Sequence, residues 1–245
     1  MSNNLLTDDL SAPRNGATAA NIEIDTGTGN LTVDDVPEDT QVLASGALQY
    51  FEKQGRPTEF FGTEGAKATV KLMATATGRP WFRLPWAACL GGTEWQIHLN
   101  PSVSSEIAAH TGGGDVKLNL ADMALTNLSA DTGGGNIDIS LPEHAAELSV
   151  KARTGGGNIS IEIGDAISGR NTVEANSGAG NVLVELPRGI PARVDARTGM
   201  GKVIIDPRLS KIGAHMYQSA DYEDAVDKLE ITVHSGAGNV SVTTK

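Results

Sequence analysis

A short glycine-rich corner recurs seven times along the chain and constrains its fold more than any other feature. Each copy reads Thr or Ser, then Gly, a variable residue and Gly, and the copies span residues 26–29, 111–114, 132–135, 154–157, 177–180, 198–201 and 235–238. Between Thr111 and Thr198, successive copies begin 21, 22, 23 and 21 residues apart. A fixed period in this range is typical of stacked repeat architectures.

Each corner is followed by a segment in which apolar residues alternate with polar ones. Residues 116–120, 137–141, 159–163 and 182–186 show this period of two, and a second alternating run precedes each corner. Such alternation predicts strands that bury one face. Equivalent strands that recur at one period stack in parallel. We therefore predict an all-β fold, a single-stranded parallel β-helix (β-solenoid) with coils of about 22 residues.

The residue types within the corner have physical reasons. Its first and third glycines occur in all seven copies, whereas the middle residue is Gly, Thr, Ala or Met. The two constant positions therefore need backbone angles or a close approach that a Cβ atom forbids. An asparagine follows the third glycine in five copies, at positions 30, 136, 158, 181 and 239. If the coils stack in register, these amides are expected to hydrogen-bond one another along the solenoid.

The polar, turn-rich start of the chain predicts a flexible N-terminal segment at residues 1–18, followed by a single β-solenoid domain at residues 19–245. Within that domain we expect irregular coils at 19–100, regular coils at 101–206, an insert at 207–228 and a terminal coil at 229–245. A short helix is expected from Tyr222 to Leu229. The segment 77–86 carries two of the three tryptophans and is expected to pack against the solenoid, with an exposed recognition loop as the alternative.

Composition excludes several classes of partner. The net charge of −11 argues against binding to nucleic acid or to an anionic lipid surface, because both need a basic face. No signal peptide and no run of 18 apolar residues is visible, so the sequence predicts no direct membrane insertion and a cytoplasmic location by default. The single cysteine, Cys89, lies in an apolar context and is expected to be structural.

The sequence offers no catalytic, cofactor-binding or metal-binding residues that we would assign. The glycine triplets resemble calcium-binding nonapeptides and phosphate cradles only superficially, because the acidic ligands, the Lys-Ser/Thr ending and the following helix are missing. Among the outward carboxylates, Glu185 and Asp206 come nearest to a stacked pair. A polar residue also precedes each corner, and this row is expected to form a solvated ladder of offsetting charges, with a binding groove as the alternative: His110, Asp131, Arg153, Asn176, Arg197 and His234.

Several phrases of the sequence resemble the toast-rack and adhesin-like β-solenoid families. They are residues 130–142, with a glycine corner, a strand and Leu-Pro, together with residues 94–101, 186–191 and 217–225. The pattern is similar to the C-terminal domain of LiaF-type cell-envelope stress proteins. This resemblance covers residues 22–245 and implies a β-helical bacterial domain, often attached to a membrane segment and, in LiaF-type proteins, linked to regulation of a sensor kinase. It implies an envelope-associated location and transfers no catalytic residue.

The leading functional hypothesis is a non-enzymatic bacterial binding or scaffolding module with a protein partner, adhesin-like or associated with envelope stress. A carbohydrate-active β-helix enzyme and a self-assembling, bactofilin-like structural protein are the alternatives. We expect a monomer or small homo-oligomer, because the insert at 207–228 could cap the last coil through Met216, Tyr217 and Tyr222.

Overall fold

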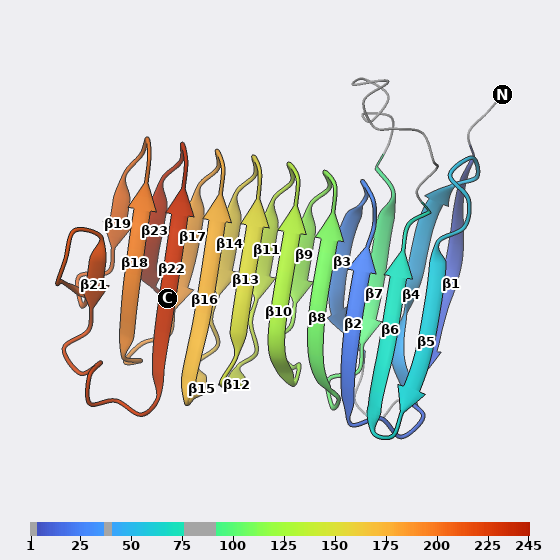
Figure 1. Cartoon of the computed structure of the whole chain (residues 1–245), viewed down its shortest axis with the longest axis horizontal. Helices are drawn as coiled ribbons and strands as arrows, with labels where there is room; N and C mark the ends of the chain where they lie inside the picture. Colours follow the sequence, from blue (N-terminus) through green and yellow to red (C-terminus); the bar gives the residue numbers. More distant parts are fainter. Residues whose placement is uncertain (1–3, 37–40, 76–91) are drawn as a thin grey trace.

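Two long β-sheets face each other in the computed structural model, which describes residues 4–36, 41–75 and 92–245 (Figure 1). The all-β prediction is confirmed, and every regular element within those ranges is a strand. Along the 10-stranded sheet the order is β1 (Leu5–Pro13), β4 (Val42–Phe51), β7 (Glu94–Leu99), β3 (Asn30–Asp35), β9 (Val116–Asn119), β11 (Ile137–Ser140), β14 (Ile159–Glu162), β17 (Val182–Leu186), β23 (Val240–Thr244) and β19 (Val203–Ile205).

The second large sheet has 11 strands, in the order β20 (Ser210–Lys211), β21 (Met216–Gln218), β18 (Ala192–Thr198), β22 (Lys228–Ser235), β16 (Arg170–Ser177), β13 (Ser149–Thr154), β10 (Leu125–Thr132), β8 (Ser104–Thr111), β2 (Ala19–Asp25), β6 (Lys67–Met73) and β5 (Thr58–Glu64). A small third sheet pairs β12 (His144–Ala146) with β15 (Ala166–Ser168). Between the two large sheets, alternate side chains such as Ile139, Ile161 and Val184 form one buried core.

Corresponding strands of neighbouring repeats pair in parallel and in register. Thr111 lies beside Thr132, which lies beside Thr154, so each corner stacks on the corner of the adjacent repeat. The hydroxyl of this residue makes two hydrogen bonds. Thr154 Oγ1 donates to the carbonyl of Gly135 at 2.8 Å and accepts from the backbone N–H of Gly157 at 3.1 Å. The same pair of bonds occurs at Thr132, Ser177 and Ser235.

Thr154→Val is expected to lower the free energy of unfolding by about 2 kcal/mol, because a buried carbonyl and a buried N–H would lose their common partner. Thr154→Ser is the matched control and should cost under about 1 kcal/mol, since serine fills this position in two other copies and keeps both bonds. Urea unfolding of the three proteins measures the difference. Equal losses for valine and serine would show that the hydroxyl contributes nothing at the corner.

The predicted amide ladder is confirmed on the exposed side of the corner. Asn136 Oδ1 accepts from the N–H of Asn158 at 3.0 Å and from its Nδ2 at 3.1 Å, and Asn158 bonds to Asn181 in the same way. The ladder continues through Asn239 Oδ1, which accepts from the N–H of Lys202 at 2.9 Å. A carbonyl-bearing side chain therefore links each corner to the next until Lys202, whose side chain offers no acceptor.

Stacking order differs from sequence order at the C-terminal end, which corrects the expected terminal coil at 229–245. Strands β22 and β23 lie inside the stack, between β16 and β18 and between β17 and β19 respectively. The outermost coil is therefore β18–β19. Because the repeats have equivalent faces, the chain can cross over through residues 206–227 and return to fill the inner position.

Three further expectations were wrong. Residues 5–13 of the expected flexible segment form β1, which pairs with β4 and buries Leu10 and Ala12. The expected helix at 222–229 is a turn leading into β22, where Leu229, Ile231 and Val233 alternate into the core with the period of a strand. Residues 42–64 also contribute the antiparallel strands β4 and β5 rather than coils. The predictions for segment 77–86 and Cys89 lie outside the described residues.

Candidate functional site

The polar residues before the corners form a continuous row on the outer face of the 11-stranded sheet. Register places them in the order Asp25, His110, Asp131, Arg153, Asn176, His234 and Arg197. The predicted row therefore exists, but its order is changed. His234 stands between Asn176 and Arg197, because its coil is the one inserted out of sequence order.

A shallow depression lies in this row where Arg153, Asn176 and His234 meet the neighbouring corners. The Arg153 guanidinium donates to Glu174 Oε1 at 2.9 Å, and Asn176 Nδ2 donates to the same oxygen at 2.8 Å. The hydrogen bond from Arg153 lowers the pKa of the Glu174 carboxyl below its ordinary value, so Glu174 stays ionised. The depression thus presents fixed donors and an imidazole, a set that suits a polar partner group held by hydrogen bonds.

Glu185 and Asp206, which the sequence suggested as the nearest to a stacked pair, do not lie side by side. Thr243 lies beside Glu185 in the inserted strand β23, so Asp206 of the outermost coil is one strand further away. The register instead places Glu162 directly beside Glu185. Lys245 Nζ lies 3.1 Å from Glu162 Oε1 and 3.2 Å from Asp165 Oδ1, which offsets the like charges.

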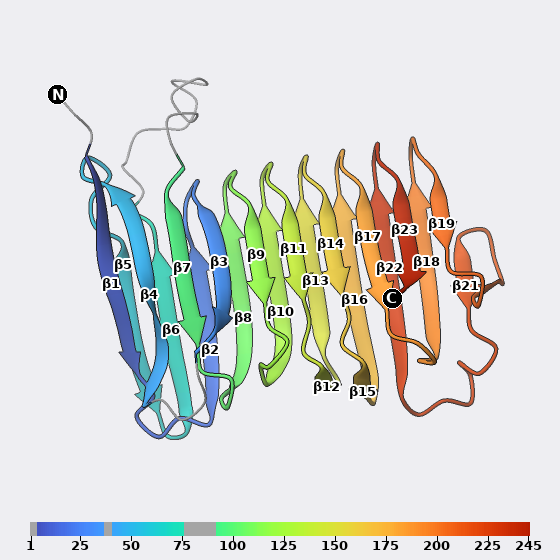
Figure 2. The ribbon, with the colours of Figure 1, turned by 180° about the vertical axis from the view of Figure 1, so that it is seen from behind.

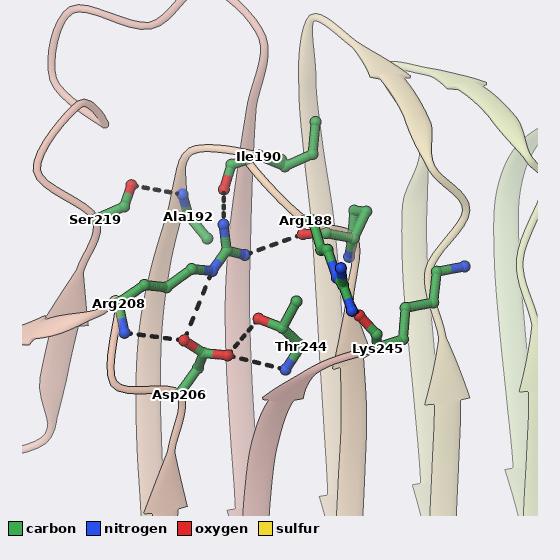
Figure 3. Close-up of polar contacts among 9 residues, drawn as sticks. Arg188, Ile190, Ala192, Asp206, Arg208, Ser219, Thr244 and Lys245 are labelled. Carbon is green, nitrogen blue, oxygen red and sulfur yellow. Dashed lines mark hydrogen bonds and ion pairs between the residues drawn. The ribbon is translucent and has the colours of Figure 1, made fainter.

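Asp206 belongs to a cluster that joins the outermost coil to the inserted one (Figure 3). Its carboxylate accepts from the N–H of Thr244 at 3.0 Å, from the Thr244 hydroxyl and from the N–H of Arg208 at 2.9 Å. Burial alone would raise the pKa of Asp206, but the hydrogen bonds from Thr244 and the nearby Arg208 outweigh it and lower that pKa. The cluster therefore holds a carboxylate, and its bonds are structural.

Arg208 extends the same cluster to the loop that connects β17 with β18. Its guanidinium donates to the carbonyl of Ile190 at 2.9 Å and to that of Pro187 at 3.2 Å. Arg188 Nε, from the same loop, donates to the carbonyl of Lys245 at 3.1 Å. Side-chain hydrogen bonds therefore connect three chain segments that are distant in sequence, at residues 187–190, 206–208 and 244–245 (Figure 3).

A second anchor fixes the insert against the 11-stranded sheet. The Tyr222 ring is buried, with the Arg193 guanidinium 4.3 Å and Lys228 Nζ 4.9 Å from its centroid. Its hydroxyl donates to Glu230 Oε1 at 2.7 Å, and burial together with Glu230 raises the pKa of Tyr222 to about 12. Packing of Tyr222 against the last coil was expected from the sequence, but its partners Arg193 and Glu230 were not, because an isolated tyrosine in an acidic loop gives no periodic signal.

A metal site and a membrane span each place requirements on the side chains of the described residues. Across residues 4–36, 41–75 and 92–245, no group of three or more His, Cys, Asp or Glu residues is placed to hold a metal ion. In the same ranges no helix is long and apolar enough to cross a membrane. What the described surface offers is a set of registered polar rows.

The model of the N-terminal domain of toast_rack, DUF2154, matches residues 1–162. The chain belongs to the toast-rack family. Its fold is shared by a "putative cell adhesion protein" from Clostridium sporogenes, with a TM-score of 0.68 and 20% identity over 99% of this chain and 100% of that one. A "putative adhesin" from Bacteroides fragilis is much less similar, with a TM-score of 0.35 and 10% identity over 98% of each chain. No curated protein was found to be a sequence relative.

Proposed function

We propose that this toast-rack protein is a non-enzymatic bacterial binding or scaffolding module, built as a single-stranded parallel β-helix with coils of about 22 residues. Its partner in this proposal is another protein, and its location is the cell envelope. Membership of the family and the adhesion-related name of the similar Clostridium sporogenes structure support this assignment. An envelope-stress role, as in LiaF-type proteins, is the more specific form of the proposal.

The observation that carries the proposal is the depression at Arg153, Asn176 and His234. Its donors are fixed by bonds to Glu174 and by registered strands, so little side-chain entropy is lost when a partner binds. The surrounding row repeats polar groups about 4.8 Å apart, which suits an extended partner lying along the stack.

The test is a binding screen on immobilised peptides and glycans, followed by measurement of reducing ends released from each glycan that binds. We expect binding without turnover, weakened at least about tenfold by Arg153→Glu or His234→Glu. Lys117→Glu, on the outer face of the opposite sheet, is the matched control and should bind like the native protein. Equal binding by all variants would remove this face from the proposal.

A carbohydrate-active enzyme is the second candidate, because Glu162 and Glu185 stand side by side on adjacent coils. Two carboxylates separated by about 5 Å are the usual requirement for a retaining glycosidase. The ion pair from Lys245 to Glu162 opposes this reading, since the general acid of such a pair must be protonated. Release of reducing ends that is abolished by Glu185→Gln would establish the enzyme and reject the binding module.

A further inference from the structure

The two ends of the stack are stepped in opposite senses (Figures 1 and 2). At the C-terminal end, β21 and β20 extend the 11-stranded sheet beyond β18, whereas the 10-stranded sheet ends at β19. At the other end the 10-stranded sheet extends beyond β7 by β4 and β1, and the 11-stranded sheet extends beyond β6 by β5 alone. The 10-stranded sheet therefore ends at β19, two strands short of the other sheet, and at the opposite end it projects one strand further, to β1.

The edge of β19 offers backbone groups and apolar side chains that the described chain does not cover. The carbonyl of Lys202 accepts from Val240 N–H, and Asp206 N–H donates to the carbonyl of Val242, so these alternate residues face β23. The N–H and C=O groups of Val203 and Ile205 consequently face away from the stack. Ile204 is 51% exposed and Met200 is 73% exposed beside this edge. An edge of this kind is a template for strand addition.

Strand β1 has the direction and the hydrogen-bonding pattern that this edge requires. It is antiparallel to β4, which is antiparallel to β7, so β1 runs parallel to the coil strands, including β19. The carbonyl of Asn4 accepts from Glu52 N–H, so even-numbered residues of β1 face β4 and the groups of Asp9 and Ser11 face outward.

We propose that β1 of a second copy of this chain adds in parallel to β19, joining the 10-stranded sheets head to tail. With Val203 beside Leu10 of the second copy, Ile205 lies beside Ala12, and the core-facing rows of both sheets continue across the junction. Val203 and Ile205 then form three backbone hydrogen bonds with Asp9 and Ser11, and the fourth is lost because Pro13 has no N–H.

Charge and shape favour a second copy as the occupant. In the same register the exposed Lys202 lies beside the exposed Asp9, on the outer face of the joined sheet. At the junction, two strands (β1 and β4) would lie between the coils of the two copies in the 10-stranded sheet. In the 11-stranded sheet three strands would lie there: β21, β20 and β5. Of these three strands, β20 has only two residues, so the difference in strand number between the two sheets is small. The inference goes beyond the proposed binding role, because it uses the ends of the stack rather than the polar face.

The test is the mass of the whole chain by light scattering from about 1 to about 200 µM, a range in which a small interface associates. We expect the native mass to rise with concentration, whereas Ile204→Lys remains at the 25.5 kDa of one chain. Leu183→Lys is the matched control and should associate like the native protein, since Leu183 and Ile204 flank Ser241 in one outer-face row. A constant native monomer, or equal association of both variants, would overturn the proposal.

A second measurement identifies the strands that meet. Asp9→Cys protein and Lys202→Cys protein, each also carrying Cys89→Ala, are mixed under mild oxidation and should form a covalent dimer of one chain of each. Lys117→Cys replaces Lys202→Cys in the control mixture, because Lys117 is exposed in mid-stack. The same yield of mixed dimer in both mixtures would show random collision and would overturn the assignment of β1 to β19.

Discussion

Gly135→Ala is expected to lower the free energy of unfolding by about 3 kcal/mol. A Cβ atom at Gly135 would overlap the carbonyl oxygen of Gly114 in the neighbouring coil, and that oxygen cannot move without opening the stack. Because Thr132 Oγ1 also donates to the Gly114 carbonyl, the displacement would weaken a buried hydrogen bond. Urea unfolding followed by circular dichroism measures the loss.

Gly134→Ala is the matched control, one residue away in the same corner. A Cβ atom at Gly134 would meet no atom within 4 Å, so its effect should stay within about 0.5 kcal/mol of zero. Equal losses at the two positions would mean that the cost comes from the conformational freedom of glycine rather than from the approach of coils. Gly135→Ala and Gly134→Ala together therefore distinguish the two physical reasons why glycine recurs in the corner.

The sequence indicated which corner glycines matter but left their reason open. Backbone angles and close approach were both compatible with a constant first and third glycine, because either excludes a Cβ atom. In the structure only Gly27 among the corner glycines has φ in the left-handed region, at 71°. A Cβ atom at any of the other first or third glycines would meet a carbonyl of the adjacent coil, as one at Gly157 would meet that of Gly135. That contact depends on which coil lies next, which a single repeat cannot specify.

The order of the coils was the part of the fold that sequence reasoning missed. All repeats present similar apolar rows, so Val240 fits beside Val182 as well as beside Val203, and the period of the corners does not choose between orders. The choice depends on particular contacts such as Tyr222 with Glu230 and Asp206 with Thr244. These contacts involve single polar residues without periodicity, so the repeat pattern did not indicate them.

The candidate site was predicted in part for the same reason. Alternation correctly placed His110, Asp131 and Arg153 on one outward row, because their coils are adjacent in sequence. The depression needs His234 beside Asn176, and these residues come from coils 58 positions apart. Sequence periodicity therefore identifies the members of a solenoid surface, whereas the crossover decides which members are neighbours.

Arg208→Met is expected to cost about 3 kcal/mol, because it removes the donor from two partly buried carbonyls and leaves Asp206 without its nearby guanidinium. The carbonyls belong to Pro187 and Ile190, in the loop that must hold the outermost coil after the inserted coil has filled the inner position. Calorimetric or urea unfolding measures the change. Arg208→Lys should recover only part of the loss, since an ammonium group does not reproduce the planar fork that reaches both oxygens.

Arg188→Met is the control from the same loop. Arg188 is exposed and donates to the single carbonyl of Lys245, so its replacement should cost less than about 1 kcal/mol. If Arg208→Met were equally mild, the crossover would be held by apolar packing alone. If Arg208→Met is severely destabilising, the Arg208 cluster is what holds β19 in place at the edge of the sheet. The same variant should then also weaken head-to-tail association, because the edge of β19 keeps its position only while this cluster is intact.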